Sequence, residues 1–370
     1  MTGIAPVQPG VDPERYAVID PETGAIAPGR APSLTHRDYV SLYRWMRFLR
    51  AIDERMIVLQ RQGRISFYGA ATGQEAAVIG TGYVLAPGDW ILPALREGGV
   101  ALLRGYPFSA YVDQCFGNAT DLEKGRQMPC HYGHRDVNYV TLSSNIATQL
   151  TQAVGVALAQ KTTRSGGVAV GYIGDGGTSE ADFHVALEFA ARLHAPVVFV
   201  CQNNQWAIST GVGQQTRARS IAHKAHGYGL PGFAVDGNDV LACAEVMRHA
   251  VERARRGEGP SLIEALTYRI GAHSTSDDPT RYRDEAITEQ WKQRDPIARF
   301  RRTLDHLGLW DDARDAALEA EHDARIRAEI QRAEAVGPPE LETLFEDVYA
   351  EPTPLLREQQ AALRRHLALS

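Results

Sequence analysis

A glycine-rich turn that carries one acidic residue is the segment most suited to chemistry. Gly174-Asp175-Gly176-Gly177 follows an apolar stretch, and Asn203-Asn204 follows a second apolar stretch after an intervening helical pattern. A right-handed strand-helix-strand unit brings the carboxyl ends of both strands to one sheet edge, so we expect Asp175 and Asn204 to converge. A carboxylate and an amide oxygen, together with phosphate oxygens and water, suit Mg²⁺ and suit a soft metal poorly.

The surroundings of Asp175 favour a phosphate ligand over a bare tight turn, which is the alternative for this motif taken alone. The adjacent glycines remove side chains where a diphosphate would approach the backbone. Thr178 and Ser179 are placed to cap a following helix, with capping-box-like spacing from Ser179 to Asp182, and a helix N-terminus attracts anions. The sequence therefore predicts a magnesium-diphosphate site at this edge.

The elements around this site alternate between strand and helix, which is typical of an α/β fold with a mostly parallel sheet covered by helices on both faces. The expected strands are 90–92, 168–173, 197–201 and 262–268, and the expected helices are 35–62, 74–85, 146–161, 179–194 and 240–256. We expect three parts: an extended arm over 1–35, an α/β domain over 36–280 and a helical region over 281–370 packed on that domain.

Both ends of the chain depart from this alternation. Pro and Gly recur at short intervals in residues 1–35 without either hydrophobic period, which predicts an arm that is disordered or wrapped on a partner. Residues 281–335 are polar and helical, Pro338-Pro339 interrupts them, and 341–367 has the pattern of an amphipathic helix.

Composition narrows the partners and the compartment. The 370 residues are 44% hydrophobic and carry a net charge of -6, which gives no basic surface for nucleic acid and no membrane patch. No apolar run approaches the roughly 20 residues of a membrane helix. The cysteines are far apart and predict reduced thiols in a bacterial cytoplasmic protein: Cys115, Cys130, Cys201 and Cys243.

The interval between GDG and NN resembles the thiamine diphosphate fingerprint. The segment VGYIGDGGTSEADFHVALEFAARLHAPVVFVCQNNQWAIST resembles the cofactor motif of alpha subunits of branched-chain 2-oxo acid dehydrogenases. The resemblance continues through REGGVALLRGYP, GNATDLEKGRQMPCHYG, YVTLSSNIATQLTQAVG, VDGNDV and TYRIGAHSTSDDPTRYR, and it covers residues 40–370. It implies the thiamine-diphosphate-binding fold.

The resemblance implies a role for each residue near the turn. Asp175, the Asn204 side chain and the Trp206 carbonyl would hold Mg²⁺ against the diphosphate. Arg96 would donate to the terminal phosphate, with a surface salt bridge as the alternative. His273 would lie beside the cofactor, where it could bind the diphosphate, hold the substrate carboxylate or move protons during acyl transfer. A solvated loop histidine is the alternative for His273.

A second group of residues lies before the glycine-rich turn. By the resemblance, Ser143, Thr148 and Gln149 would bind a structural monovalent cation, K⁺. Ser144 and Ile146 would meet the aminopyrimidine ring of the cofactor. A helix start capped by Ser and Thr side chains is the alternative for this segment.

Substrate choice and regulation rest on a few further positions. Leu95 and Ser144 would border the substrate pocket, and Leu95 replaces an aromatic residue of eukaryotic members. Asn145 and Gln202 replace a proline and an arginine in the same members. Ser274 occupies the place of the phosphorylation switch of mitochondrial relatives, where a dianion would repel the diphosphate and the substrate carboxylate.

The resemblance implies an enzyme that works with partners. The cofactor would supply the decarboxylation chemistry, and a beta subunit would supply the glutamate that activates it in an alpha2-beta2 heterotetramer. The acyl group would pass to a lipoyl arm of a dihydrolipoyl acyltransferase core, and the substrates would be the 2-oxo acids of valine, leucine and isoleucine. A pyruvate or acetoin dehydrogenase alpha subunit is the nearest alternative.

Two classes are more distant alternatives. A dinucleotide-dependent oxidoreductase also has a glycine-rich turn after a strand, but no GxGxxG follows any expected strand here. A non-catalytic assembly subunit would be expected to lose the metal pair, and both Asp175 and Asn204 are present.

Overall fold

A parallel five-stranded sheet forms the centre of the computed structural model, which describes residues 3–30 and 32–368. The strand order is β1-β2-β3-β7-β6, and every neighbouring pair in it is parallel. The strands are β1 (Trp90–Leu92), β2 (Ala169–Gly174), β3 (Val197–Asn203), β6 (Gly232–Asp236) and β7 (Ser261–Leu266). A short antiparallel pair, β4 (Trp206–Ala207) and β5 (Thr210–Gly211), follows β3. The predicted α/β class is confirmed.

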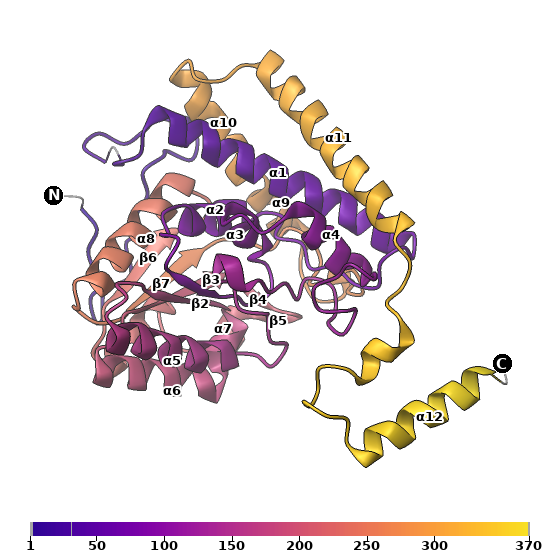
Figure 1. Ribbon diagram of the computed structural model, residues 1–370. Helices are drawn as coiled ribbons and strands as arrows, with labels where there is room; N and C mark the ends of the chain where they lie inside the picture. Colours follow the sequence, from indigo (N-terminus) through magenta and orange to yellow (C-terminus); the bar gives the residue numbers. More distant parts are fainter. Residues whose placement is uncertain (1–2, 31, 369–370) are drawn as a thin grey trace.

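Helices cover both faces of this sheet (Figure 1). On one face lie α5 (Thr148–Thr163) and α6 (Ala181–Leu193), and on the other lie α2 (Glu75–Tyr83) and α8 (Val240–Arg255). Alternate residues of each strand therefore enter two separate cores: Val170 and Tyr172 of β2 pack toward α2 and α8, while Ala169 and Ile173 pack toward α5 and α6. Because both faces are buried, the strands are continuously apolar.

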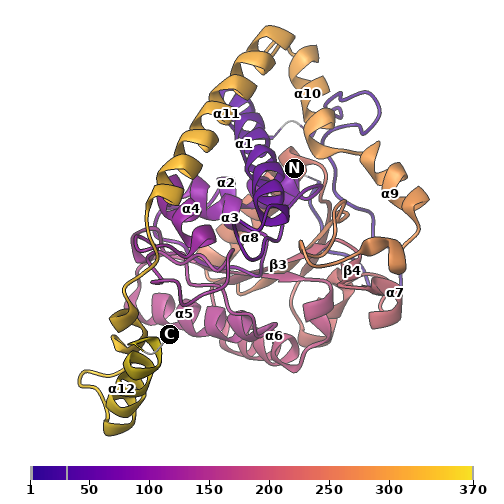
Figure 2. The same ribbon diagram turned by 90° about the vertical axis from the view of Figure 1, so that its right-hand side faces the viewer.

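A long amphipathic helix, α1 (His36–Arg61), packs outside α2 and buries the residues that repeat every three or four positions. Thr35 and Asp38 form a capping box at its start. The polar region after β7 folds into α9 (Glu285–Lys292), α10 (Pro296–His306) and α11 (Asp312–Ala335), and α11 runs alongside α1 (Figure 2).

The remaining helices are short or peripheral. They are α3 (Gly98–Leu103), α4 (Phe108–Phe116), α7 (Val212–Gln215) and α12 (Pro354–Ala368), with 3₁₀ turns η1 (Arg135–Val137), η2 (Gly176–Ser179), η3 (Ala222–Tyr228), η4 (Pro279–Arg281) and η5 (Leu341–Phe345). After α11 the chain leaves the main body, and α12 stands apart from the sheet (Figure 1).

The N-terminal segment 3–30 lies along the outer edge of β6. Tyr16 donates its backbone N–H to the carbonyl of Ala234 at 2.9 Å and accepts from the N–H of Asp236 at 3.0 Å. The buried carboxylate of Asp239 accepts hydrogen bonds from two backbone amides of the segment, at 2.6 and 2.7 Å. The expectation of disorder is wrong for residues 3–30, which pack on their own chain. Contact of the arm with a partner stays a prediction.

Two local expectations are wrong. The helix expected at 179–194 begins at Ala181, because Gly176–Ser179 forms a 3₁₀ turn and no side chain caps α6. Thr178 donates its hydroxyl to the Asp175 carbonyl at 2.8 Å instead of capping a helix. Strand β6 and the helices α3 and α4 were not anticipated.

Two absences concern the described part of the chain. None of its helices is both long and apolar enough to cross a membrane. The four cysteines are free and buried.

Candidate active site

Asp175 stands at the carboxyl end of β2, where the strand pairs with β3 and Gly174 lies opposite Gln202. Its carboxyl group is 2% exposed and accepts a hydrogen bond from Gln215 Nε2 at 2.9 Å. Burial raises the pKa of Asp175 to about 6, and hydrogen bonds from Gln215 and from the backbone of Asn204 act in the opposite direction. The backbone of Asn204 therefore lies beside the Asp175 carboxylate, and a cation here would stabilise the carboxylate form. Joint metal binding by the two side chains stays a prediction.

Asn204 and Trp206 lie beside this carboxylate, in the turn after β3. The Asn204 side chain donates from Nδ2 to Gln74 Oε1 at 3.1 Å and accepts at Oδ1 from the Trp206 N–H at 3.2 Å. The Trp206 carbonyl accepts from Arg269 Nη1 at 3.3 Å. The three oxygen groups expected to hold Mg²⁺ thus belong to one short stretch of the sheet edge.

The glycines around Asp175 do two different things. A Cβ on Gly176 would lie 2.5 Å from Ala207 Cβ, and a Cβ on Gly177 would lie 2.5 Å from Ile173 Cδ1. These two glycines therefore allow close packing of the protein's own atoms, which differs from the expected clearance for a diphosphate. Gly174 alone meets nothing within 4 Å.

Two buried arginines face this edge without a carboxylate partner. Arg96 is 7% exposed and donates to the backbone carbonyls of Ala70 and, at 2.7 Å, of His273. Arg269 is 1% exposed and donates to the Ile208 carbonyl at 2.7 Å and to the Tyr282 hydroxyl at 2.8 Å. Within residues 3–30 and 32–368, neither guanidinium forms an ion pair. Because unpaired buried charge is costly, this region is suited to an anion.

His273 lies between the two arginines. Its Nδ1 is 3.5 Å from Arg96 Nη2 and 3.4 Å from Arg269 Nη1, and its backbone N–H donates to Asp277 Oδ2 at 2.7 Å. Burial, followed by the positive charges of Arg96 and Arg269, lowers the pKa of His273 to about 4. The imidazole is therefore neutral near pH 7, and it is not the solvated histidine that was the alternative.

The second group of predicted residues lies at the start of α5. Thr148 donates its hydroxyl to Ser143 Oγ at 3.2 Å, and Gln149 Nε2 donates to the Tyr172 carbonyl at 2.8 Å. The buried Gln149 Oε1 has no partner among the described residues. The alternative for this segment, a helix start capped by Ser and Thr side chains, is wrong. Ala147, at φ +73°, occupies the N-cap position of α5, and no side chain caps the helix there.

The remaining predicted residues surround this edge more loosely. Ser144 Oγ lies 2.6 Å from His131 Nε2, and the Ile146 side chain is 59% exposed. Leu95 is half-buried. Ser274, which follows His273 in the chain, is half-buried and accepts at Oγ from the Ser276 N–H at 3.4 Å.

Three site residues were missed by the sequence analysis. Arg269 falls within the quoted segment TYRIGAHSTSDDPTRYR and was given no role, although a charged residue just after an apolar strand was a usable signal. Gln215 and Gln74 come from segments distant in sequence, and only the fold brings them to Asp175 and Asn204.

No group of three or more His, Cys, Asp or Glu side chains that could hold a metal occurs in the part of the chain that the structure describes. A metal at this edge would therefore depend on one carboxylate together with amide and carbonyl oxygens. Such a set suits a hard cation that keeps some water or phosphate ligands.

Comparison with known proteins identifies the class. The model of the dehydrogenase E1 component family, whose members depend on thiamine diphosphate, matches residues 43–342. The chain belongs to this family.

The relatives define its branch. The chain is 44% identical over 351 residues, 95% of its length and 74% of the relative, to the 2-oxoisovalerate dehydrogenase subunit alpha 2, mitochondrial, of Arabidopsis thaliana. It is 41% identical to the corresponding alpha subunits of Bos taurus and Homo sapiens, covering 95% of the chain and 78% and 79% of those relatives. Within the family the chain is an alpha subunit of the branched-chain 2-oxo acid dehydrogenase type.

The same relatives correct one expectation. The prediction of a bacterial cytoplasmic location is contradicted, because these relatives are mitochondrial proteins of eukaryotes. The free cysteines on which that prediction partly rested do not distinguish one compartment from another.

Proposed function

We propose that this chain, with a beta subunit, decarboxylates branched-chain 2-oxo acids using thiamine diphosphate and Mg²⁺, and passes the acyl group to a lipoyl arm. The observation that carries the proposal is a pair of buried arginines near the buried Asp175, Arg96 and Arg269. Neither has a carboxylate partner in the part of the chain that the structure describes. A magnesium diphosphate would balance both charges, because its phosphates would pair with the arginines and its cation would pair with the carboxylate.

The polar atoms at the sheet edge fit this group. Gln74 Nε2, Gln202 Oε1, Gln215 Oε1 and Arg269 Nε are buried and have no hydrogen-bond partner among the described residues. Buried polar groups are normally paired, so several unpaired ones in one region indicate a ligand that would pair them.

Each residue then has an assigned task. Asp175, Asn204 Oδ1 and the Trp206 carbonyl would hold Mg²⁺, and Arg96 would donate to the terminal phosphate. Open space at Gly174 would leave the backbone accessible. When bound, thiamine diphosphate supplies a carbanion at C2 and an electron sink for decarboxylation.

His273 would form a hydrogen bond with the substrate. The two arginines surround Nδ1, so Nε2 is the ring nitrogen that can face the substrate. Because both guanidinium groups can only donate, Nδ1 accepts and the neutral ring carries its proton on Nε2, from which it can donate a hydrogen bond to the substrate. The nearby guanidinium groups can hold the substrate carboxylate. The substrate pocket would be bordered by Leu95 and Ser144, and phosphorylation of Ser274 would introduce a dianion that competes for the same arginines.

The start of α5 would complete the cofactor site. Ser143, Thr148 and Gln149 would bind K⁺, and the unpaired Gln149 Oε1 supports this assignment. Ser144 and Ile146 would meet the aminopyrimidine ring.

The proposal includes an assembly. A beta subunit would supply the glutamate that activates the cofactor in an alpha2-beta2 heterotetramer, and a dihydrolipoyl acyltransferase core would supply the lipoyl domain. We further propose the division into an arm over 1–35, a cofactor-binding domain over 36–280 and a helical region over 281–370.

Calorimetry of the reconstituted alpha-beta complex tests the cofactor assignment. Thiamine diphosphate should bind tightly only with Mg²⁺, and Asp175→Ala should abolish that dependence. Asp113→Ala is the matched control, because Asp113 is also a buried carboxylate but lies in α4. Cofactor binding that is indifferent to Mg²⁺ or to Asp175→Ala would overturn the proposal.

A rate comparison tests the substrate class. The complex should turn over 2-oxoisovalerate much faster than pyruvate, and the alpha chain alone should show negligible decarboxylation. A preference for pyruvate would favour the pyruvate dehydrogenase alternative. Full activity without a beta chain would contradict the shared site.

A further inference from the structure

The segment 68–74, between α1 and α2, forms hydrogen bonds with several residues at and near the candidate site. Its backbone carbonyls accept hydrogen bonds from four residues near the sheet edge: Arg96 at Ala70, Ile270 at Thr72 (3.4 Å), Thr267 at Gly73 (2.9 Å) and Thr275 at Tyr68 (3.2 Å). The segment therefore supports Arg96, the chain just after β7 and the loop that contains His273.

Two buried carboxylates hold the segment from the other side. Asp53 of α1 accepts from the Ala71 N–H at 2.7 Å, and Glu75 of α2 accepts from the Gly73 N–H at 2.9 Å. Gly73 adopts φ +92°, and a Cβ there would lie 2.6 Å from both Ile270 Cγ1 and the Tyr268 carbonyl. Two of its backbone amides are fixed by carboxylates, and its turn at Gly73 accepts only glycine. The segment therefore holds the side chain of its last residue in a defined position.

That last side chain is Gln74, which is 0% exposed. Its Oε1 accepts from Asn204 Nδ2 at 3.1 Å, while its Nε2 has no partner among the described residues. A buried amide with half of its hydrogen-bonding capacity unused costs free energy. Among the described residues, the Gln74 side chain makes one hydrogen bond, to Asn204, so its role is best sought there.

We propose that Gln74 is a positioning residue for the divalent cation, because its Oε1 determines which atom of the Asn204 carboxamide faces the metal. The inference rests on the proposed function. A carbonyl oxygen can only accept, so Asn204 must present its NH₂ group to Gln74. The oxygen Oδ1 then points away from Gln74. One of its lone pairs accepts from the Trp206 N–H, and the other remains for the cation.

Three variants of the alpha-beta complex test the proposal through Mg²⁺ affinity, measured by titration at saturating thiamine diphosphate. Gln74→Met keeps the length of the side chain but removes the acceptor, and should weaken Mg²⁺ binding by about tenfold or more, as for other outer-sphere partners. Gln74→Glu keeps an acceptor and should stay within about threefold of the parent. Gln114→Met is the matched control, since Gln114 is also a buried, half-paired glutamine but lies in α4.

A double-mutant cycle with Asn204→Ala tests whether Gln74 affects Mg²⁺ binding through Asn204. If Gln74 acts through Asn204, Gln74→Met should add nothing in the Asn204→Ala background. An affinity within twofold of the parent for Gln74→Met, or an equal loss in Gln114→Met, would overturn the proposal. If Gln74→Met fails to fold, a tenfold loss of Mg²⁺ affinity in the folded Gln74→Glu variant would also overturn the proposal. Failure of the proposed function itself would show differently, as a parent complex that does not respond to Mg²⁺ at all.

Discussion

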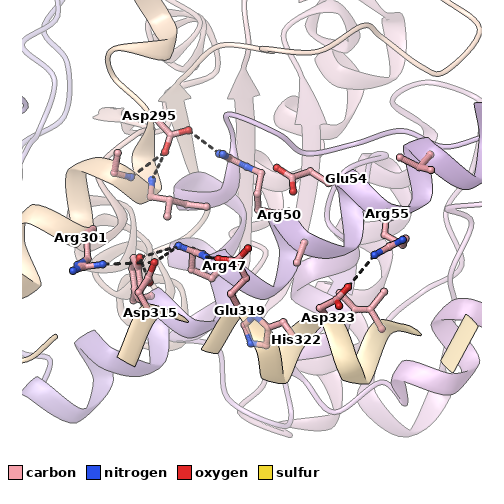
Figure 3. A pocket seen from close by; sticks show the side chains of 16 residues that line it. Arg47, Arg50, Glu54, Arg55, Asp295, Arg301, Asp315, Glu319, His322 and Asp323 are labelled. Atoms are coloured by element: carbon pink, nitrogen blue, oxygen red, sulfur yellow. Dashed lines mark hydrogen bonds and ion pairs between the residues drawn. The ribbon is translucent and has the colours of Figure 1, made fainter. Parts of the chain in front are cut away.

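The sheet edge at Asp175 and the groove between α1 and the α10–α11 pair both gather arginines, but they balance the charge in opposite ways. The groove encloses about 710 Å³, and its arginines point at carboxylates across it (Figure 3). The ion pairs there are Arg47 with Asp315 at 2.7 Å, Arg50 with Asp295 at 2.8 Å and Arg55 with Asp323 at 2.9 Å. At the sheet edge, the partners of Arg96 and Arg269 among the described residues are all neutral groups.

The charges of the groove stabilise the fold, whereas those of the sheet edge are suited to binding a ligand. In the groove each of these arginines is neutralised by the chain itself, so an anion entering it would have to displace a carboxylate. At the sheet edge the positive charge is buried and unmatched, which destabilises the protein without its ligand and favours an anionic ligand. The size of a cavity is therefore a poorer guide to the site than the balance of charge within it.

Removal of Arg96 should have the largest effect. Arg96→Met should raise the dissociation constant of thiamine diphosphate about thirtyfold, or about 2 kcal/mol, because a charge-assisted contact with phosphate is lost. Burial, followed by repulsion from Arg269, lowers the pKa of Arg96 to about 10. The thermal midpoint of the cofactor-free protein should therefore change little, because the lost hydrogen bonds are offset by removal of this unfavourable buried charge. Calorimetry and thermal unfolding measure the two quantities. A lower thermal midpoint of Arg96→Met, with unchanged affinity for thiamine diphosphate, would contradict the contrast between the two regions.

Removal of a groove arginine should do the opposite. Arg47→Met should lower the free energy of unfolding by about 1 kcal/mol, because Asp315 loses a partly buried partner. The affinity for thiamine diphosphate should stay within twofold of the parent. Thermal unfolding and calorimetry again provide the readouts, and a loss of cofactor affinity comparable to that of Arg96→Met would show that the groove serves the site.

The smallest effect concerns one histidine in each region. Burial lowers the pKa of both His273 and His322 to about 4, with the arginines near each adding to the shift. Both rings are therefore neutral at pH 5 to 7. Between pH 6.5 and about 4 each histidine binds protons more readily in the unfolded state, so the free energy of unfolding falls as the pH falls through this range.

Cofactor binding should distinguish the two rings. The magnesium diphosphate should raise the pKa of His273, because the anion compensates Arg96 and Arg269, and should leave that of His322 unchanged. Proton NMR titration of both rings, with and without cofactor, measures this difference. A shift in both rings, or in neither, would contradict the contrast between the two regions.

The parts of the fold that the sequence predicted well are those with strong local signals. The apolar runs of β2 and β3 end in GDGG and NN, so both the strands and the meeting of Asp175 with Asn204 followed from local pattern and the handedness of the crossover. Strand β6 was missed because Gly232–Asp236 is short and is recognisable mainly from its pairing with β7 and with the arm.

The site residues that escaped prediction depend on long-range packing. Arg269 reaches the carbonyls of Trp206 and Ile208, which lie about sixty positions earlier in the chain, and Gln74 reaches Asn204 across a still longer separation. No local pattern encodes such contacts. Likewise, the glycines at 176 and 177 suggested room for a ligand, but the space beside them is filled by Ala207 and Ile173.

The arm at residues 3–30 has a consequence for solubility. Strand β6 is the last strand of the sheet, and an unpaired last strand is a template for association with other chains. The backbone of Tyr16 occupies hydrogen-bonding groups of β6 at Ala234 and Asp236. The arm thus acts as a cover that prevents the sheet from extending into a neighbouring molecule.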